Sequence, residues 1–421
     1  MTKWKSKDLI KHLRASDLRG ISLLGTQAVT GVTRISEGVH QSVWRSVGAP
    51  KGKSEGQTRG ITRISYASIY AITTLLGKSA DAVLQKLQPV FDAIDKDKPS
   101  TPEREAIIAT LNGVVGDRLE ESANPLATPM SLRFQGQLLT PECLAREHSD
   151  HPSPRILLMI HGLCMNDLQW NAKDNETVVN HGEMLAEHLG YTPVYLRYNS
   201  GRHISQNGKE LSMQLEQLFS DSAEQIKEIA VVAHSMGGLV IRSACYYGEQ
   251  QQCRWLQRVN KIVYLGTPHH GAPLEKAGSK VDVVLDKTPY TAPFVRLTKL
   301  RSAGITDLRY GYLVDDDWMD QHGQPHRRSD TRPNEHQHVA LTEHIDHYCI
   351  AATTASRRSM LANHLVGDGL VPLNSALGQQ KDPDRTLAFL PSNQWVAFQM
   401  THMELLSHPD VTRRLMNWLE E

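Results

Sequence analysis

The sequence predicts an α/β fold in which helices flank a mostly parallel sheet. From residue 155 onward, short apolar segments alternate with segments of helical periodicity, as they do when parallel strands are joined by helical crossovers. One apolar segment, residues 229–234, runs straight into a turn of small residues and then into a helix. The chain has 421 residues, 40% of them hydrophobic, so a core of roughly 250–300 residues leaves room for an extension or an insertion.

The first third of the chain, residues 1–125, is expected to form a helical extension. Helices are predicted over residues 6–17, over 61–76 with Gly77 as the C-terminal cap, and from Pro102 toward Leu119. Residues 1–60 carry eleven Lys and Arg against four Asp and Glu. Three interpretations of this basic region stay open: a flank packed on the core, a peripheral contact with an anionic membrane or lipid surface, and a contact for oligomerisation or a partner.

The α/β domain is predicted over residues 126–421. After a short hairpin near residues 131–139, strands are expected at 155–160, 192–198, 229–234, 261–266, 347–353, 387–390 and 395–400, with a last helix at 409–419. Residues 272–337 interrupt this alternation. They mix apolar helical pieces with polar loops, so they are expected to form a lid or cap insertion.

Charge and cysteine content narrow the class of protein. The formal net charge is zero, which argues against a nucleic acid as partner. Five cysteines without paired spacing favour reduced thiols over a disulfide framework. The N-terminus lacks the apolar stretch of a secretory signal, and no stretch of the chain is long and apolar enough to span a bilayer. A cytoplasmic protein is therefore expected.

The turn after residues 229–234 carries the candidate nucleophile, Ser235. Ala233 and Gly237, two positions to either side, are small, as crowding of the backbone at a sharp strand-to-helix turn requires. Ala233 stands where Gly is usual. The following helix directs backbone N–H groups toward the site and favours developing negative charge there. This context predicts a nucleophilic serine, and a turn without chemistry is the alternative.

Acyl transfer also needs oxyanion donors, a base and an orienting acid. Residues 155–160 lead into an HGL segment, where Gly162 lets the backbone turn, so the N–H groups of Leu163 and Met236 are the expected donors. The base is expected after the last strand, at His402, with His408 in the turn before the final helix as its rival.

The acid is expected at Asp368, in a turn flanked by glycines that follows the strand at 347–353. Asp346 and the three acids at 315–317 are less well placed. Along the chain these residues follow the order serine, aspartate, histidine. An α/β fold that carries a nucleophile at such a turn uses the same order.

Five segments carry a family resemblance: HGL, AHSMGG, GTPHHG, GDGLVP and THMELL. Together they resemble the α/β-hydrolase superfamily, and within it the bacterial esterase and lipase branch and the GPI-inositol-deacylase-like families. The resemblance covers about residues 130–421. It implies an α/β-hydrolase fold with Ser235 as nucleophile, Asp368 as acid and His402 as base. In GTPHHG, His269 and His270 are expected to shape the pocket wall.

The resemblance implies a serine hydrolase that cleaves carboxylic esters, an esterase or lipase, through an acyl-enzyme. An acyl ester or lipid is the expected substrate, and no cofactor is expected. Thioesterase, phospholipase or amidase activity stays open, as does a non-catalytic scaffold whose N-terminal helices mediate interactions. The sequence does not give the oligomeric state.

Six histidines lie between residues 322 and 347, with Asp317 and Asp320 nearby. Imidazole and carboxylate groups are zinc ligands. Their spacing here matches no metal-binding motif, and the segment is polar and contains Arg and Pro. A solvated loop is therefore expected, and no metal.

Overall fold

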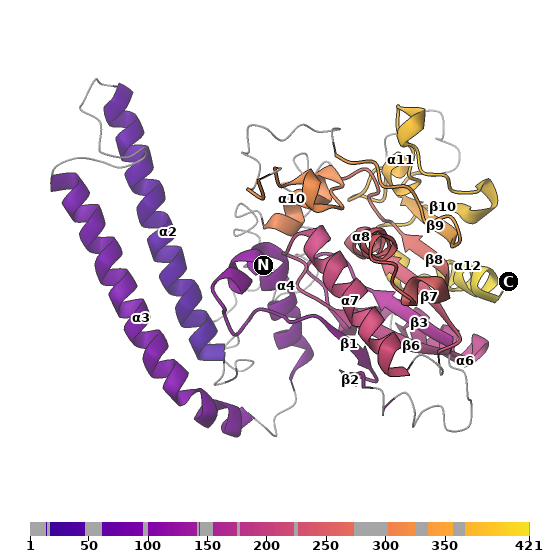
Figure 1. Ribbon diagram of the computed structural model, residues 1–421, viewed down its shortest axis with the longest axis horizontal. Coiled ribbons are helices and arrows are strands. Elements are labelled where there is room, and N and C mark those ends of the chain that lie inside the picture. The colour runs from indigo at the N-terminus through magenta and orange to yellow at the C-terminus, as the bar shows by residue number, and fades with distance from the viewer. Residues whose placement is uncertain are drawn as a thin grey trace. The chain divides into compact units, whose positions relative to one another are not determined.

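The computed structural model describes residues 14, 17–46, 61–95, 100–140, 143, 155–174, 177–222, 226–272, 302–320, 322–324, 336–356 and 367–420. The chain divides into two compact units (Figure 1). The smaller comprises Met1–Arg104 and Leu119–Ala127, and the larger comprises Glu105–Arg118 and Thr128–Glu421. The helix expected at 6–17 lies almost wholly outside the described residues. None of the described helices is both long and apolar enough to cross a membrane.

The smaller unit contains two long helices, α2 (Asp17–Ser46) and α3 (Ile61–Asp95), that pack against each other. Gly77 lies inside α3, so its predicted role as a helix cap is wrong. Its place reflects packing instead, because a Cβ there would lie 2.3 Å from the side chain of Thr26 on α2. An ion pair of 2.7 Å between Arg19 and Asp81 also links the two helices.

The larger unit is built around an eight-stranded sheet in the order β10-β9-β8-β7-β3-β6-β1-β2 (Figure 1). Its parallel strands are β3 (Arg155–Ile160), β6 (Tyr191–Arg197), β7 (Glu228–His234), β8 (Val259–Leu265), β9 (Asp346–Thr353) and β10 (Gln394–Phe398). The hairpin β1 (Ser131–Phe134) and β2 (Gln137–Leu138) pairs antiparallel at one edge. The predicted α/β fold with a mostly parallel sheet is confirmed.

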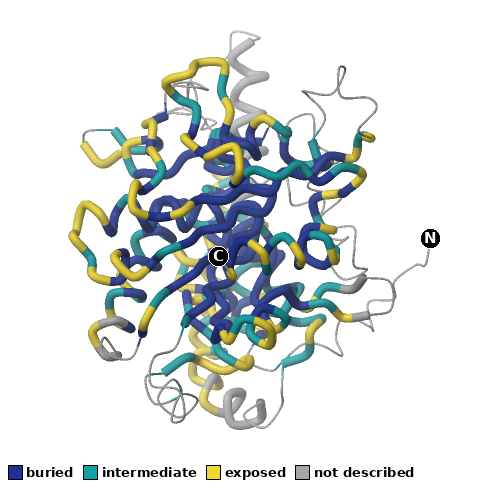
Figure 2. Tube along the Cα trace, turned by 90° about the vertical axis from the view of Figure 1, so that its right-hand side faces the viewer, coloured by how far each residue is buried: buried dark blue, intermediate teal, exposed yellow. Residues whose placement is uncertain are grey.

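Helices pack on this sheet through two apolar clusters. One cluster joins the sheet to α7 (Ile204–Ser222) and α8 (Met236–Gln250), and the other joins it to α6 (His181–Leu189) and α12 (Pro409–Glu420). Figure 2 shows a buried centre with exposed segments around it. Because the central strands are buried on both faces, their sequences are continuous apolar runs. This is why the strands predicted from the sequence agree closely with the observed ones.

Residues 387–390 do not form the expected strand. The segment LAFL suggested a strand because it is apolar throughout, but only Leu387 and Phe389 are buried, and their neighbour Leu390 is exposed. The backbone N–H of Leu387 donates to Gly378 and that of Phe389 donates to Leu387, so the segment is held locally and not by a neighbouring strand.

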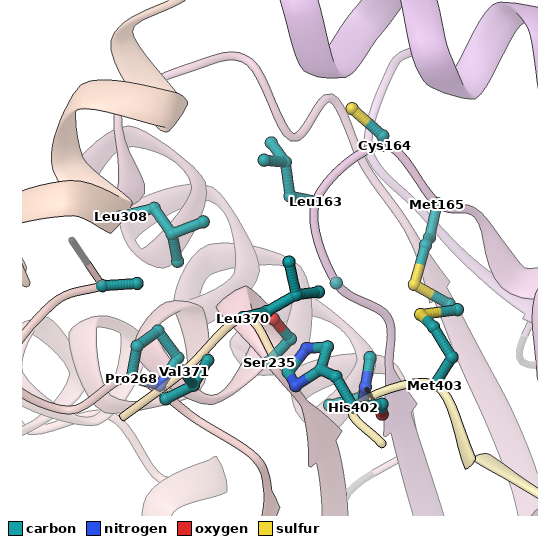
Figure 3. Close-up of a pocket in the computed structure, with 13 residues that line it drawn as sticks. Leu163, Cys164, Met165, Ser235, Pro268, Leu308, Leu370, Val371, His402 and Met403 are labelled. Atoms are coloured by element: carbon teal, nitrogen blue, oxygen red, sulfur yellow. Dashed lines mark hydrogen bonds between the residues drawn. The ribbon is translucent and has the colours of Figure 1, made fainter. Parts of the chain in front are cut away.

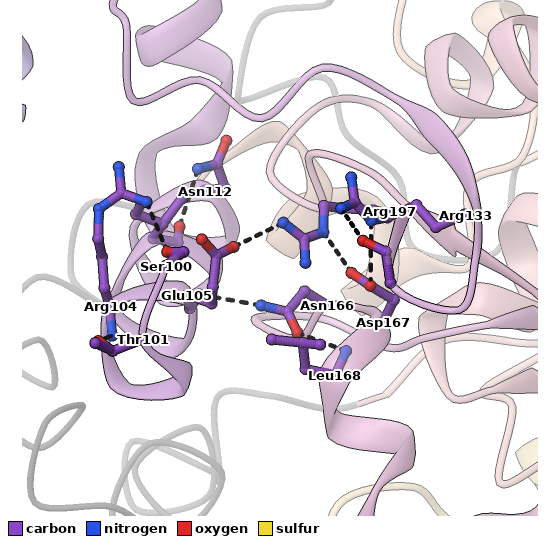
Figure 4. Close-up of polar contacts among 12 residues, drawn as sticks. Ser100, Thr101, Arg104, Glu105, Asn112, Arg133, Asn166, Asp167, Leu168 and Arg197 are labelled. Atoms are coloured by element: carbon purple, nitrogen blue, oxygen red, sulfur yellow. Dashed lines mark hydrogen bonds and ion pairs between the residues drawn. The ribbon is translucent and has the colours of Figure 1, made fainter. Parts of the chain in front are cut away.

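Helix α4 (Pro102–Glu121) begins in the smaller unit, and its middle part belongs to the larger one. There, Glu105 pairs with Arg197 of β6 at 2.7 Å, and Arg197 also pairs with Asp167, as Figure 4 shows. The backbone carbonyl of Glu105 accepts a hydrogen bond from Asn166 Nδ2 at 3.1 Å. Part of the predicted extension therefore contacts the sheet. The division at residue 125 stays a prediction, because these contacts do not report which segments fold independently.

Candidate active site

Ser235 occupies the sharp turn between β7 and α8 (Figure 3). Its backbone has φ 54° and ψ −123°, a region that residues with a side chain rarely adopt and that occurs mostly at functional sites. The turn is held on both sides, because Ser235 N–H donates to the Leu265 carbonyl at 2.8 Å and Gly238 N–H donates to the Ser235 carbonyl at 3.1 Å. The fold therefore fixes the strained turn before any substrate arrives.

The small residues beside Ser235 are explained by the neighbouring strand ends. A Cβ at Gly237 would lie 2.6 Å from the backbone oxygens of both Ile160 and His161, at the end of β3. At Gly238 it would lie 2.0 Å from the side chain of Thr267, just after β8. Helix α8 can start this close to the sheet only because these two positions lack side chains.

We expect Gly237→Ala to lower the free energy of unfolding by about 1–3 kcal/mol, because the added methyl group meets backbone that cannot move aside. Urea denaturation measures the change. Gly25→Ala on α2 is the matched control, since a Cβ there meets no atom within 4 Å. That variant should be more stable by about 0.5–1 kcal/mol, because Ala favours a helix over Gly. Equal stability of the Gly237→Ala variant and the unmodified protein would contradict the packing argument.

His402 and Asp368 are joined by a buried hydrogen bond between His402 Nδ1 and Asp368 Oδ2 at 2.6 Å. Asp368 Oδ1 accepts the backbone N–H groups of Leu370 at 2.9 Å and Val371 at 2.8 Å, which fix the carboxylate. The backbone N–H of His402 also donates to the Asp368 carbonyl at 3.1 Å. Two loops far apart in sequence are thus locked together, and one carboxylate oxygen remains for the imidazole.

Ser235 and His402 line the same pocket, and Figure 3 shows their side chains next to each other. The rival His408 lies elsewhere, at the start of α12, where its Nδ1 accepts the Asp410 N–H at 3.2 Å. Among the rival acids, Asp317 accepts three backbone N–H groups, and Asp346 is exposed at the start of β9. Of the alternatives weighed from the sequence, the structure brings together Ser235, His402 and Asp368.

Of the two expected oxyanion donors, Leu163 lines this pocket, and Met236 directly follows Ser235, which lines it too. Met236 is the first residue of α8, so its N–H has no acceptor within the helix. Leu163 lines the pocket on the loop after β3. His161 braces this loop: its Nδ1 lies 2.9 Å from the Gly162 carbonyl, and its own carbonyl accepts the Tyr198 hydroxyl at 2.9 Å.

The sequence did not indicate three further contacts that hold the loop. Cys164 adopts φ 59°, and its N–H donates to Ser200 Oγ at 3.0 Å. A Cβ on Gly113 of α4 would lie 2.3 Å from Cys164 Sγ, so the glycine allows α4 to approach the loop. The stacked rings of His161 and Tyr198, 4.3 Å apart, complete the set. In each of these contacts the two partners lie far apart in the sequence, so no local pattern could have indicated the contacts.

The pocket around Ser235 has walls that are almost wholly apolar. Leu163, Met165, Leu370 and Val371 form much of the wall (Figure 3). Leu308, on α10 (Ala303–Tyr310) in the predicted insertion, adds to it. The part of the insertion at 273–301 lies outside the described residues.

Comparison with protein families identifies the chain. Residues 151–363 match the family described as a PGAP1-like alpha/beta domain, which is half of the chain. The chain belongs to the PGAP1-like α/β-domain family. The expected relation to α/β hydrolases is thereby confirmed. The match includes Ser235 and ends before Asp368 and His402.

Solved structures similar to this PGAP1-like protein are bacterial and archaeal lipases and esterases. The mature lipase BlEst2 of Bacillus licheniformis is 16% identical, with a TM-score of 0.40 over 64% of this chain and 93% of its own. The esterase Pf2001 of Pyrococcus furiosus is 15% identical (TM-score 0.36, 64% and 82%). The Staphylococcus hyicus lipase is 12% identical (TM-score 0.34, 64% and 95%). No curated protein sequence matches the chain.

The histidines of the region 322–347 do not form a metal centre within the described residues, where no three metal-ligating side chains come together. His344 Nε2 contacts the Leu256 carbonyl at 3.0 Å, and His347 lies between the Tyr264 hydroxyl and the Thr342 carbonyl, both at 3.1 Å. His336 and His338 line a second pocket, described below. His326 lies outside the described residues.

Buried histidines should make this PGAP1-like protein sensitive to acid. Burial lowers the pKa values of His161, His181 and His347 from 6.5 to about 4. Between pH 4 and 6.5 the unfolded chain therefore binds more protons than the folded one, so stability is complete above pH 6.5 and falls as the pH drops through this range. Each such histidine contributes a slope of about 1.4 kcal/mol per pH unit.

Thermal unfolding at pH 7, 6 and 5 measures this loss as a falling melting temperature. A His188→Asn variant is the control, because His188 is exposed on α6 and the slope should persist without it. A melting temperature that stays constant from pH 7 to pH 5 would refute the expectation.

Proposed function

We propose that this PGAP1-like protein hydrolyses carboxylic esters, with Ser235 as the nucleophile. The observation that carries the proposal is a single pocket that holds a serine on a strained strand-to-helix turn and a histidine whose Nδ1 is bonded to a buried aspartate. Such a set provides a nucleophile, a base and an orienting acid in the order that the fold requires.

The reaction follows from the positions of these groups. His402 Nε2 takes the Ser235 Oγ proton as Oγ attacks the ester carbonyl carbon, and the carbonyl oxygen becomes an oxyanion held by the N–H groups of Leu163 and Met236. As the tetrahedral intermediate collapses, His402 gives the proton to the leaving alcohol. A water molecule then attacks the acyl-enzyme, His402 accepts its proton, and the acid leaves as Ser235 recovers its hydrogen.

Asp368 supports this cycle without taking part in proton transfer. Its Oδ2 accepts the Nδ1 proton of His402, which leaves Nε2 as the lone-pair nitrogen in the resting state. When His402 becomes a cation, the carboxylate stabilises the positive charge.

The apolar pocket wall favours an ester whose acyl group is apolar, including lipids. Leu308 belongs to the segment 272–337, which supports a role for that segment as a lid above the serine. Thioesters, phospholipids and amides could enter the same site, and a panel of p-nitrophenyl esters, acyl-CoAs and phospholipids distinguishes them by turnover. A scaffold role, with the N-terminal helices as the working part, predicts no turnover of any of them.

Labelling with a fluorophosphonate tests the proposal directly, because the probe reacts with activated serine hydroxyls and not with ordinary ones. The full chain should form one adduct, located at Ser235 by mass spectrometry of peptides. Ser220, exposed on α7, should remain unlabelled and serves as the internal control. Absence of an adduct at Ser235 would favour the scaffold interpretation.

A further inference from the structure

A second pocket shares a turn with the first. Pro268 and Ala272 line the pocket of Ser235, whereas His269 and His270, between them in sequence, line a separate small cavity. Arg242 of α8 and residues 336–339 form other parts of the lining. None of the proposed catalytic residues lines this cavity.

Arg242 is a buried cation without a carboxylate partner among the described residues. Its side chain is 5% exposed, and its Nη2 donates to the Val339 carbonyl. Its Nη1 lies 3.4 Å from His269 Nδ1, and its Nε has no hydrogen-bond partner. Burial lowers the pKa of Arg242 to about 10. A buried charge normally has a counterion, so this guanidinium marks a place where negative charge is missing.

Three histidines around Arg242 also have ring nitrogen atoms without a hydrogen-bond partner. His269 Nε2, His270 Nδ1 and His336 Nδ1 are buried and have no hydrogen-bond partner. The contact between Arg242 and His269 Nδ1 makes that nitrogen the acceptor, so His269 Nε2 carries the proton and can donate. Buried polar atoms are nearly always paired in folded proteins, and here four of them gather at one cavity.

Charges near the cavity are mainly positive. Burial is the main cause of the lowered pKa values of His270 and His336, and electrostatic repulsion by Arg242 and Arg385 lowers them further. The carboxylate of Asp382 acts in the opposite direction on His338. This balance opposes a metal cation, since two guanidinium groups would repel it, and it favours an anion that can accept several hydrogen bonds.

We propose that this cavity binds a small oxyanion, for which inorganic phosphate is the probe. Arg242 Nε and His269 Nε2 donate to its oxygens, and the anion supplies the missing countercharge. The site is independent of the proposed ester hydrolysis, because no residue of the Ser235 pocket contributes to it. The same hydrogen-bond donors would recognise free phosphate and the phosphate group of an esterified headgroup.

Thermal unfolding of the full chain in sodium phosphate, compared with sodium chloride at equal ionic strength, tests the site. A bound anion stabilises the folded state, so we expect the melting temperature to rise by about 2 °C or more in 10 mM phosphate. Arg242→Met should abolish the rise. Arg254→Met is the matched control, since Arg254 is an exposed arginine paired with Glu216, and it should keep the rise.

If Arg242→Met does not fold, equilibrium dialysis of the unmodified protein and of His269→Gln against radioactive phosphate replaces it. About one equivalent bound to the unmodified protein, and at least tenfold weaker binding to the variant, supports the site. Glycerol 3-phosphate in the same assay distinguishes the sources, because it competes only if an esterified phosphate also fits. An equal melting temperature in phosphate and chloride, or less than 0.1 equivalent bound, overturns the proposal.

Discussion

Replacing Ser235 with Ala should lower kcat/KM for a p-nitrophenyl ester by about 10⁵-fold, because the attacking oxygen is removed while the oxyanion donors remain. KM should change little, since the pocket wall is untouched. Ala has the same Cβ as Ser, so the strain at φ 54° and the stability of the turn should also stay nearly the same.

Hydrolysis rates at several substrate concentrations measure the effect, and the melting temperature checks that the variant is folded. Ser220→Ala is the matched control and should retain full activity, because Ser220 is exposed on α7 and does not line the pocket. A Ser235→Ala variant with more than a tenth of the normal turnover would remove Ser235 from the mechanism.

Asp368→Asn should reduce kcat by about 10⁴-fold with little change in stability, as expected when the catalytic histidine adopts the wrong tautomer. The hydrogen bonds at Asp368 determine how the amide sits. Its Oδ1 position accepts two backbone N–H groups, from Leu370 and Val371, so the amide oxygen must occupy it. The NH₂ group then faces His402 Nδ1 and donates to it, which places the imidazole proton on Nε2, where it blocks removal of the Ser235 proton.

Asp410→Asn is the matched control, because Asp410 is a half-exposed residue in the first turn of α12 that pairs with Arg413, and its loss should not affect kcat. NMR of the imidazole nitrogens should report the proton on Nδ1 in the unmodified protein and on Nε2 in Asp368→Asn. A loss of less than tenfold would show that Asp368 does not orient His402.

Much of the fold could be predicted because the central strands are buried on both faces and read as apolar runs. Gly77 was misread because a glycine that allows two helices to approach closely has the same local sequence as one that ends a helix. The segment 387–390 was misread because a short apolar run does not by itself require a strand partner.

The three residues that lie together at the site could be found from the sequence, because each follows a strand of a parallel sheet and the ends of such strands meet at one edge. The bonds that fix Asp368 come from backbone groups two and three residues away, and no side-chain pattern reveals them. The cluster around Arg242 joins segments separated by up to 97 positions, as its bond to Val339 shows. Only the folded chain brings such residues together.

The position of α4 has a consequence for how this chain can be shortened. Removing everything before residue 126 would take away Glu105, which pairs with Arg197, and Gly113, which lies against the loop of Cys164. The shortened chain would keep every residue of the proposed catalytic set, but it would lose these contacts of α4, which hold the loop that carries the proposed oxyanion donor Leu163. A cut within residues 96–99, before α4 begins, keeps the contacts of α4 while removing α2 and α3.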